Sequence, residues 1–180
     1  MPAYTCDPDT ELIGRSVLAL FENIRYDMIK PILDKHGLND VDPDGWYPLQ
    51  DVLDILSDIS EQGSGLFDLV SVGISAARLS PIPPEVEALS LKEFLLLYPQ
   101  LYPRRHRNGD AGEVLAEEAG ERHVKMIFRT PYPDDLMYGL MYGFARRFLP
   151  KGTPITVFYD PDIRRSEEGG KFTVIHVVWE

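Results

Sequence analysis

The sequence predicts an α+β fold, with a helical N-terminal part followed by antiparallel β-hairpins that flank one further helix. From about residue 11 to 102, apolar side chains recur at a spacing near 3.6 residues, as on the buried face of a helix. From about residue 112 to 180 the spacing shortens to two, which is typical of a strand with one buried face. Strands in adjacent pairs favour an antiparallel sheet over a doubly wound parallel one. We expect a single domain over residues 1–180 that contains these two parts.

About four helices are expected in the N-terminal part. The first begins at Leu12, is kinked or split at Pro31, and ends at Gly37, a residue type common just after a helix. In the last of the four, Ser90 and Glu93 have the spacing of a capping box. The second to fourth helices span about residues 48–59, 67–79 and 84–97.

The C-terminal part is expected to be hairpin, helix, hairpin. A turn at residues 119–120 joins the first two strands. The helix begins with acidic residues and ends with two arginines, which suits the helix dipole. The strands and the helix span about residues 113–118, 121–129, 133–148, 153–159 and 171–179.

Two glycines, Gly139 and Gly143, lie on one face of the helix expected over residues 133–148. A glycine inside a helix costs about 1 kcal/mol relative to alanine, so a pair of them needs a reason. We expect this face to pack closely against the sheet, with access for a ligand as the alternative.

Composition excludes several function classes. With 18 Lys+Arg against 29 Asp+Glu, the formal net charge is −11, which disfavours nucleic acid and anionic membrane surfaces. The single cysteine, Cys6, cannot form an intrachain disulfide. No basic and apolar N-terminal run resembles a secretory signal, and no apolar run reaches the ~20 residues of a membrane span. We expect a cytoplasmic protein that binds neither nucleic acid nor membrane.

Catalytic and metal-binding motifs are missing from the sequence. It has no G-x-S-x-G, no phosphate-binding P-loop and no G-x-G-x-x-G after a predicted strand. The histidines lack the spacing of a zinc motif. We therefore predict no enzyme, no catalytic residue and no metal site. The four histidines are His36, His106, His123 and His176.

Residues 103–109 (PRRHRNG) concentrate positive charge in an acidic chain. Arginine side chains form paired hydrogen bonds with carboxylates and phosphates, so Arg104 and Arg105 are candidate anion-binding residues. The alternative is a solvated loop whose arginines pair with neighbouring acids.

The layout from Ser90 onward carries a family resemblance. A helix reading FLLLYPQLY (94–102) is followed by a hairpin ending in HVKMIFRT, a helix reading GLMYGFARRF (139–148), and final strands ending in FTVIHVVW. This order resembles the haem nitric oxide/oxygen binding (H-NOX) domain, whose superfamily also holds 4-vinyl reductase domains and transport-protein-particle subunits. The four N-terminal helices fit the helical half of such a domain.

The resemblance fails at the residues that hold haem in the family. The iron-ligating histidine of the family falls on Tyr102, with His106 one helical turn later. The Tyr-x-Ser-x-Arg haem-propionate motif has no counterpart before Gly139. We therefore expect no cofactor. Haem is the alternative cofactor, and Tyr102 or His106 would then be the axial ligand.

The resemblance implies a non-enzymatic sensory or ligand-binding domain, which we expect to be haem-free. It would bind a hydrophobic small molecule between its two parts, with Arg104 and Arg105 at the mouth of the cavity, and signal through a protein partner or a homodimer interface. The expected lining residues are Phe67, Val70, Leu97, Leu101, Tyr102, Met126, Phe128, Leu140, Met141 and Phe144.

Three alternatives remain open from the sequence. One is an assembly or adaptor subunit similar to the transport-particle proteins, for which an exposed apolar patch around Gly139 and Gly143 would be evidence. The others are a haem gas sensor with an atypical axial ligand and an accessory protein of tetrapyrrole metabolism.

Overall fold

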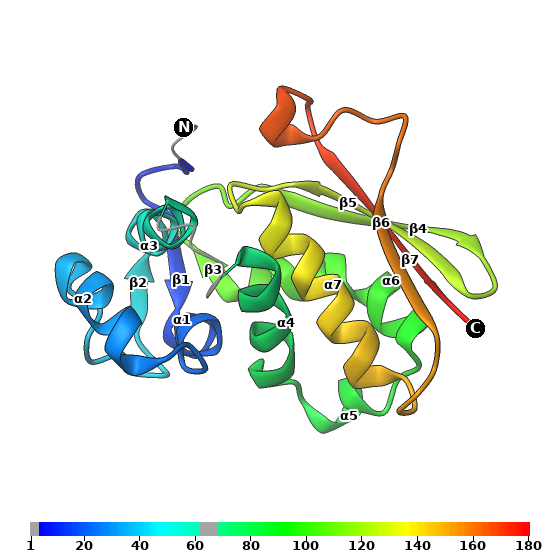
Figure 1. The fold of residues 1–180 in the computed structure, drawn as a ribbon, viewed down its shortest axis with the longest axis horizontal. Coiled ribbons are helices and arrows are strands. Elements are labelled where there is room, and N and C mark those ends of the chain that lie inside the picture. Colours follow the sequence, from blue (N-terminus) through cyan, green and yellow to red (C-terminus); the bar gives the residue numbers. More distant parts are fainter. Residues whose placement is uncertain (1–3, 62–67) are drawn as a thin grey trace.

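A computed structural model of the protein describes residues 4–61 and 68–180 and confirms the α+β class (Figure 1). Most helices precede the main sheet, and one helix lies between its strand pairs, as predicted. Two antiparallel sheets are present in the described part of the chain, a small one with strand order β2-β1-β3 and the main one with order β4-β5-β7-β6.

The helices in chain order are α1 (Gly14–Phe21), α2 (Tyr26–His36), α3 (Leu49–Glu61), α4 (Leu69–Leu79), α5 (Pro84–Glu87), α6 (Leu91–Leu101) and α7 (Asp134–Phe148), with short 3-10 helices η1 (Tyr102–Arg105) and η2 (Ser166–Glu168). The strands are β1 (Glu11–Ile13), β2 (Trp46–Pro48), β3 (His106–Arg107), β4 (Glu113–Gly120), β5 (His123–Arg129), β6 (Ile155–Tyr159) and β7 (Thr173–Trp179). None of the helices described is both long enough and apolar enough to traverse a lipid bilayer.

The first predicted helix was wrong in two respects. Its expected start is strand β1, in which buried Leu12 pairs with Tyr47 of β2 and His106 of β3. The remainder forms two helices, α1 and α2, and the break falls at residues 22–25 rather than at Pro31, which lies inside α2. Gly37 does end α2, in the left-handed conformation at φ 70°. The missing N–H of Pro31 is tolerated because this residue is on the exposed side of the helix.

The fourth predicted helix is also two helices, α5 and α6. The capping box is confirmed at the start of α6, where the Ser90 side chain accepts the Glu93 N–H while the Glu93 carboxylate accepts the Ser90 N–H. This reciprocal pair explains why a new helix begins there rather than continuing from α5.

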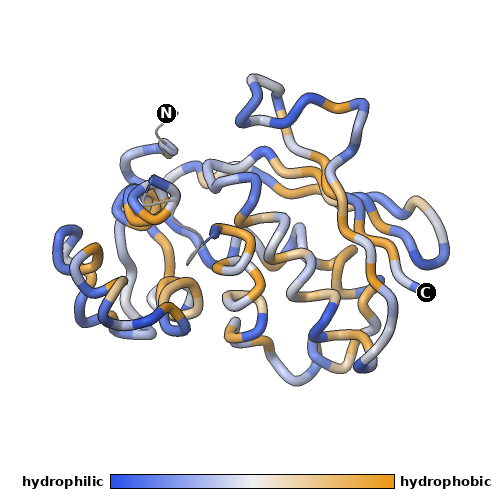
Figure 2. The backbone as a smooth tube through the Cα atoms, in the orientation of Figure 1, coloured by the Kyte–Doolittle hydropathy of each residue, from blue (hydrophilic) through white to orange (hydrophobic). Residues whose placement is uncertain are grey.

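The main sheet packs one face against α6 and α7 (Figure 1). Val124, Met126 and Phe128 of β5 face these helices with 2% or less of their surface exposed, as their alternation predicts. The opposite face is exposed at its edges, where Leu115 and Phe158 are 49% and 38% exposed, whereas Val174 and His176 on the same face are buried. Figure 2 shows hydrophobic residues along the strands of this sheet and the helices beneath it.

The glycine face of α7 packs against α4, not against the sheet as the sequence suggested. A methyl group on Gly139 would overlap the carbonyl oxygen of Val70, and one on Gly143 would lie 2.7 Å from the Cβ of Ala77. On α4, Gly73 meets the backbone of α7 in the same way. Because α4 covers this face, it is not an exposed apolar patch.

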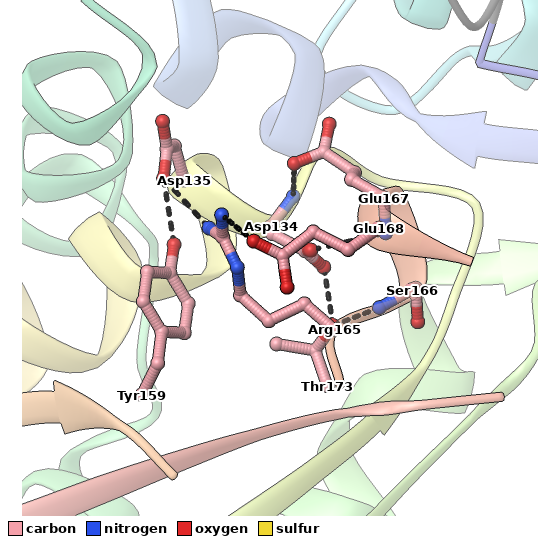
Figure 3. Close-up of polar contacts among 8 residues, drawn as sticks. All are labelled: Asp134, Asp135, Tyr159, Arg165, Ser166, Glu167, Glu168 and Thr173. Atoms are coloured by element: carbon pink, nitrogen blue, oxygen red, sulfur yellow. Dashed lines mark hydrogen bonds and ion pairs between the residues drawn. The ribbon is translucent and has the colours of Figure 1, made fainter. Parts of the chain in front are cut away.

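The polar loop of residues 160–172 crosses the N-terminus of α7 (Figure 3). Thr173 Oγ1 donates to Asp134 Oδ1 over 2.5 Å, and the Asp134 N–H donates to Glu167 Oε2 over 3.3 Å. Arg165 pairs with Glu168, so these acids are bonded within the protein. Among the residues described, no group of three or more His, Cys, Asp or Glu side chains could hold a metal ion.

Candidate functional site

A small cavity lies between the N-terminal helices and the part formed by the main sheet and α7. Its volume is about 50 Å³, and its walls come from α1, α4, α6, α7 and β3. A water molecule takes about 30 Å³ in the liquid, whereas sites for drug-sized ligands measure roughly 300–1,000 Å³. The cavity is therefore far smaller than a site for a drug-sized ligand.

Side chains that fill the centre form a hydrogen-bonded chain. Tyr102, 3% exposed, donates its hydroxyl to the carbonyl of Ala111 over 2.7 Å. His106 Nδ1 lies 3.0 Å from the carbonyl of Tyr102, and Nε2 lies 2.8 Å from the hydroxyl of Tyr132. Because a carbonyl only accepts, Nδ1 carries the proton, and Nε2 of the neutral ring accepts from Tyr132. Pairing of β3 with β1 holds His106 in this position.

Burial keeps these groups uncharged. It lowers the pKa of His106 to about 4, and the positive charge of Arg105 also lowers it, while the hydrogen bond to the Tyr102 carbonyl opposes the change. Burial raises the pKa of Tyr102 well above its usual value. At neutral pH the cavity is therefore lined by a neutral imidazole and a neutral phenol.

These residues do not fit haem. The cavity is far smaller than any organic cofactor, and both ring nitrogens of His106 are engaged by protein groups. The Tyr102 hydroxyl is bonded to a backbone carbonyl, and its raised pKa disfavours the phenolate that would bind iron.

A larger groove of about 390 Å³ lies next to the small cavity. Ser16, Tyr98 and Arg105 line both spaces and so form the wall between them. The groove runs between the β1–α1 junction, the α4–α5 connection, α6 and η1. Its lining residues are Ile13, Arg15, Ser16, Pro81, Ile82, Pro83, Phe94, Tyr98, Leu101, Arg104 and Arg105.

The groove is positively charged in an otherwise acidic protein. Three arginines line it, and no carboxylate from the described part of the chain does. Arg15 forms an ion pair with Asp44. Arg104 and Arg105 form no ion pair with any carboxylate in the described ranges, and Arg105 instead donates from Nη1 to Ser80 Oγ (3.2 Å) and Ser16 Oγ (3.5 Å).

The hydroxyl of Tyr98 also lacks a protein partner among the residues described. The side chain is only 7% exposed and lines both spaces. In the described ranges, Ser75 Oγ is the one fully buried side-chain oxygen or nitrogen without a hydrogen bond, so the Tyr98 oxygen is not sealed in protein and opens on cavity space. Burial raises the pKa of Tyr98, which keeps this hydroxyl a donor.

The predicted lining residues divide between several locations. Those on the small cavity are Tyr102, Leu140 and Phe144, whereas Leu101, Arg104 and Arg105 are on the groove, and Arg105 also reaches the cavity. The residues on neither space are Val70, Leu97, Met126, Phe128 and Met141, of which the last three are fully buried beneath the sheet. Phe67 lies outside the described residues.

Several residues of the site were not predicted. Tyr98 of α6 precedes Tyr102, the residue that caps this helix, by four positions, a spacing that could have identified it. Tyr132 and Ser16 carry no such local signal, because each reaches the site through tertiary packing.

Comparison with solved structures identifies the fold of this chain. No family model and no curated protein matches the sequence. Among solved structures, an H-NOX protein from S. oneidensis superimposes with a TM-score of 0.72 at 12% identity, covering 94% of this chain and 96% of that chain.

An oxygen-binding H-NOX domain related to soluble guanylate cyclases gives a TM-score of 0.68 at 17% identity, covering 93% of this chain and 92% of that chain. A point mutant of the T. tengcongensis H-NOX gives a TM-score of 0.67 at 16% identity, covering 93% and 94%. The chain therefore has an H-NOX-like fold, as the layout of its motifs suggested.

Proposed function

We propose that this protein is a non-enzymatic sensory domain of H-NOX-like fold that works without haem. It binds a hydrophobic small molecule and signals through a protein partner or a dimer interface. The observation that carries the proposal is the contrast between a central cavity of about 50 Å³, filled by side chains, and an adjacent groove of about 390 Å³. The fold supports a sensory role, since the solved relatives include an oxygen-binding domain related to guanylate cyclases.

The geometry of the groove supports binding of an apolar molecule. Ile82 and Leu101 contribute aliphatic surface, and Phe94 and Tyr98 contribute rings packed 6.0 Å apart on α6. A volume near 390 Å³ is at the lower end of the range for small-molecule sites. Burial of the apolar surface of a ligand would stabilise the complex by about 25 cal/mol per Å².

The proposal that the protein works without haem is tested by a visible absorption spectrum of protein expressed with 5-aminolevulinate. We expect no Soret band under oxidising or reducing conditions. A band that Tyr102→Phe or His106→Ala abolishes would overturn the proposal and identify a haem gas sensor with an atypical ligand.

The proposal that the groove binds a hydrophobic small molecule is tested with N-phenyl-1-naphthylamine, an uncharged apolar fluorophore. We expect its fluorescence to rise on binding, and Ile82→Trp, which fills the groove, to abolish the rise. Val41→Trp is the matched control, because Val41 lines a separate apolar pocket of about 250 Å³ beside α1 and α2. Binding that Val41→Trp abolishes and Ile82→Trp preserves would contradict the groove as the site.

One observation favours an assembly role as a second candidate. Leu115 and Phe158 are exposed on the two edge strands of the main sheet, on the face away from α6 and α7, where an interface could cover them. Light scattering should then detect a dimer that Phe158→Glu dissociates. A monomer at all concentrations tested would remove this candidate.

A further inference from the structure

We infer that the groove takes an amphiphilic carboxylate, a small molecule with one carboxylate head and an apolar body, and that Arg105 anchors the head. This inference rests on the proposed function and names the chemical class of its ligand. Three features of the groove carry it: an arginine with unused donors, a tyrosine hydroxyl without a partner in the described ranges, and apolar surface contributed by α6 and by the α4–α5 connection.

Arg105 has an unoccupied hydrogen-bonding edge. Both of its hydrogen bonds leave from Nη1, to the hydroxyls of Ser16 and Ser80. The Nε and Nη2 donors have no protein acceptor among the residues described. An arginine presents five N–H donors, and two parallel ones match the two oxygens of a carboxylate. The serines therefore orient the guanidinium and leave a donor pair for a ligand.

The charge of Arg105 also requires compensation. A half-buried guanidinium is stabilised by an anion, and this chain has 29 acidic residues from which to supply one. None of them pairs with Arg105 or with its exposed neighbour Arg104 in the described ranges. An anion that is not part of the chain would meet both arginines.

The Tyr98 hydroxyl provides a second, neutral donor at the same place. Tyr98 and Arg105 line the same groove, and the charge of Arg105 lowers the pKa of this hydroxyl while burial raises it. One carboxylate oxygen could accept from both Arg105 and Tyr98. Arginines also form paired hydrogen bonds with phosphate, so competition by inorganic phosphate is one outcome of the test below.

The apolar walls determine the rest of the ligand. Pro81, Ile82 and Pro83 form one side, and Phe94 and Leu101 form the other. Phe94 also stacks on Phe148 at 4.2 Å between ring centres, which fixes the orientation of its ring. A sugar or nucleotide would lose hydrogen bonds with water against these surfaces, whereas an alkyl or aryl body would not.

The test is calorimetric titration at pH 7.5 with naphthalene-1-acetate and with naphthalene-1-acetamide, which share one apolar body and differ in charge. We expect the acetate to bind at least tenfold more tightly than the amide. Arg105→Gln should remove this preference, and a urea unfolding curve like that of the wild type would show that the variant is folded. Arg122→Gln is the control, since it removes the same charge from the exposed turn between β4 and β5.

Two further variants refine the assignment. Arg105→Lys keeps the charge but loses the paired donors, so acetate binding should fall between wild type and Arg105→Gln. Tyr98→Phe should weaken the acetate a few-fold and the amide less.

The outcomes separate the inference from the proposed function. Equal affinities for acetate and amide, both lost in Ile82→Trp, would overturn the carboxylate class and leave a neutral ligand in the groove. Failure of both compounds and of N-phenyl-1-naphthylamine to bind would overturn the inference and the proposed function together. Competition by inorganic phosphate at comparable affinity would also overturn the carboxylate class.

Discussion

The buried neutral state of His106 predicts that this protein loses stability in mild acid. Its pKa in the folded protein is about 4, below the ordinary value of 6.5, so the unfolded chain binds the proton more readily. Stability from this group is therefore present above pH 6.5 and is lost as the pH falls toward 4. At 1.36 kcal/mol for each pH unit between the two pKa values, the loss amounts to about 3 kcal/mol.

The assay is urea unfolding at several pH values between 7.5 and 4, for the wild type and for His106→Asn. Asparagine keeps an N–H for the Tyr102 carbonyl but cannot titrate. We expect the variant to be less stable at pH 7.5 and to lose about 3 kcal/mol less than wild type on acidification. Tyr132→Phe should also reduce the loss, because the Tyr132 hydroxyl stabilises the neutral ring. Equal losses in the wild type and in His106→Asn would refute the reasoning.

Three further changes test the packing of the fold by urea unfolding. Gly139→Ala should cost about 2 kcal/mol or more, because the new methyl meets the backbone of α4, whereas Gly120→Ala, with ordinary space around it, should cost under about 0.5 kcal/mol. Ser90→Ala should cost about 1 kcal/mol by removing the capping box, and Ser90→Gly only a few tenths. Thr173→Val should cost about 2 kcal/mol and make the 160–172 loop sensitive to proteolysis, because it removes the donor to Oδ1 of the buried Asp134 carboxylate and leaves only the Glu167 N–H on Oδ2; exposed Thr156→Val is its control. A stable, protease-resistant Thr173→Val variant would show that the loop is held by other contacts.

Local signals in the sequence were enough for much of the fold. The capping box at Ser90, the helix stop at Gly37 and the alternation through β5 each involve residues within a few positions of one another. Propensity and periodicity report such arrangements because their physical causes are local. The long helix α7 was predictable for the same reason.

The small sheet and the break after α1 were not predictable in this way. Strands β1, β2 and β3 have only two or three residues, too few to establish a period. Glu11 pairs with Arg107, almost a hundred positions away, so the pairing depends on the completed fold. The chain between α1 and α2 contains no glycine or proline, while Pro31 sits inside α2 on its exposed side.

The position of the site could be predicted only in part, because its volume depends on which side chains meet. Periodicity correctly predicted that apolar residues of α6 and α7 lie near one another. It could not predict that His106 and Tyr132, 26 residues apart, form a hydrogen bond that fills much of the space beside these helices. Arg105 is adjacent to His106 in the chain and points its guanidinium to the serines at the wall of the groove. Two adjacent residues thus shape both spaces. His106 limits the volume of the small cavity, and Arg105 gives the groove positive charge. If a ligand in the groove pulled Arg105 toward it, strand β3 would have to move as well, because β3 begins at the next residue, His106. The pairing of His106 with Leu12 of β1 would then also have to shift. Arg105, at the wall of the groove, is therefore one residue from a two-residue strand that pairs with β1, and β1 leads directly into α1.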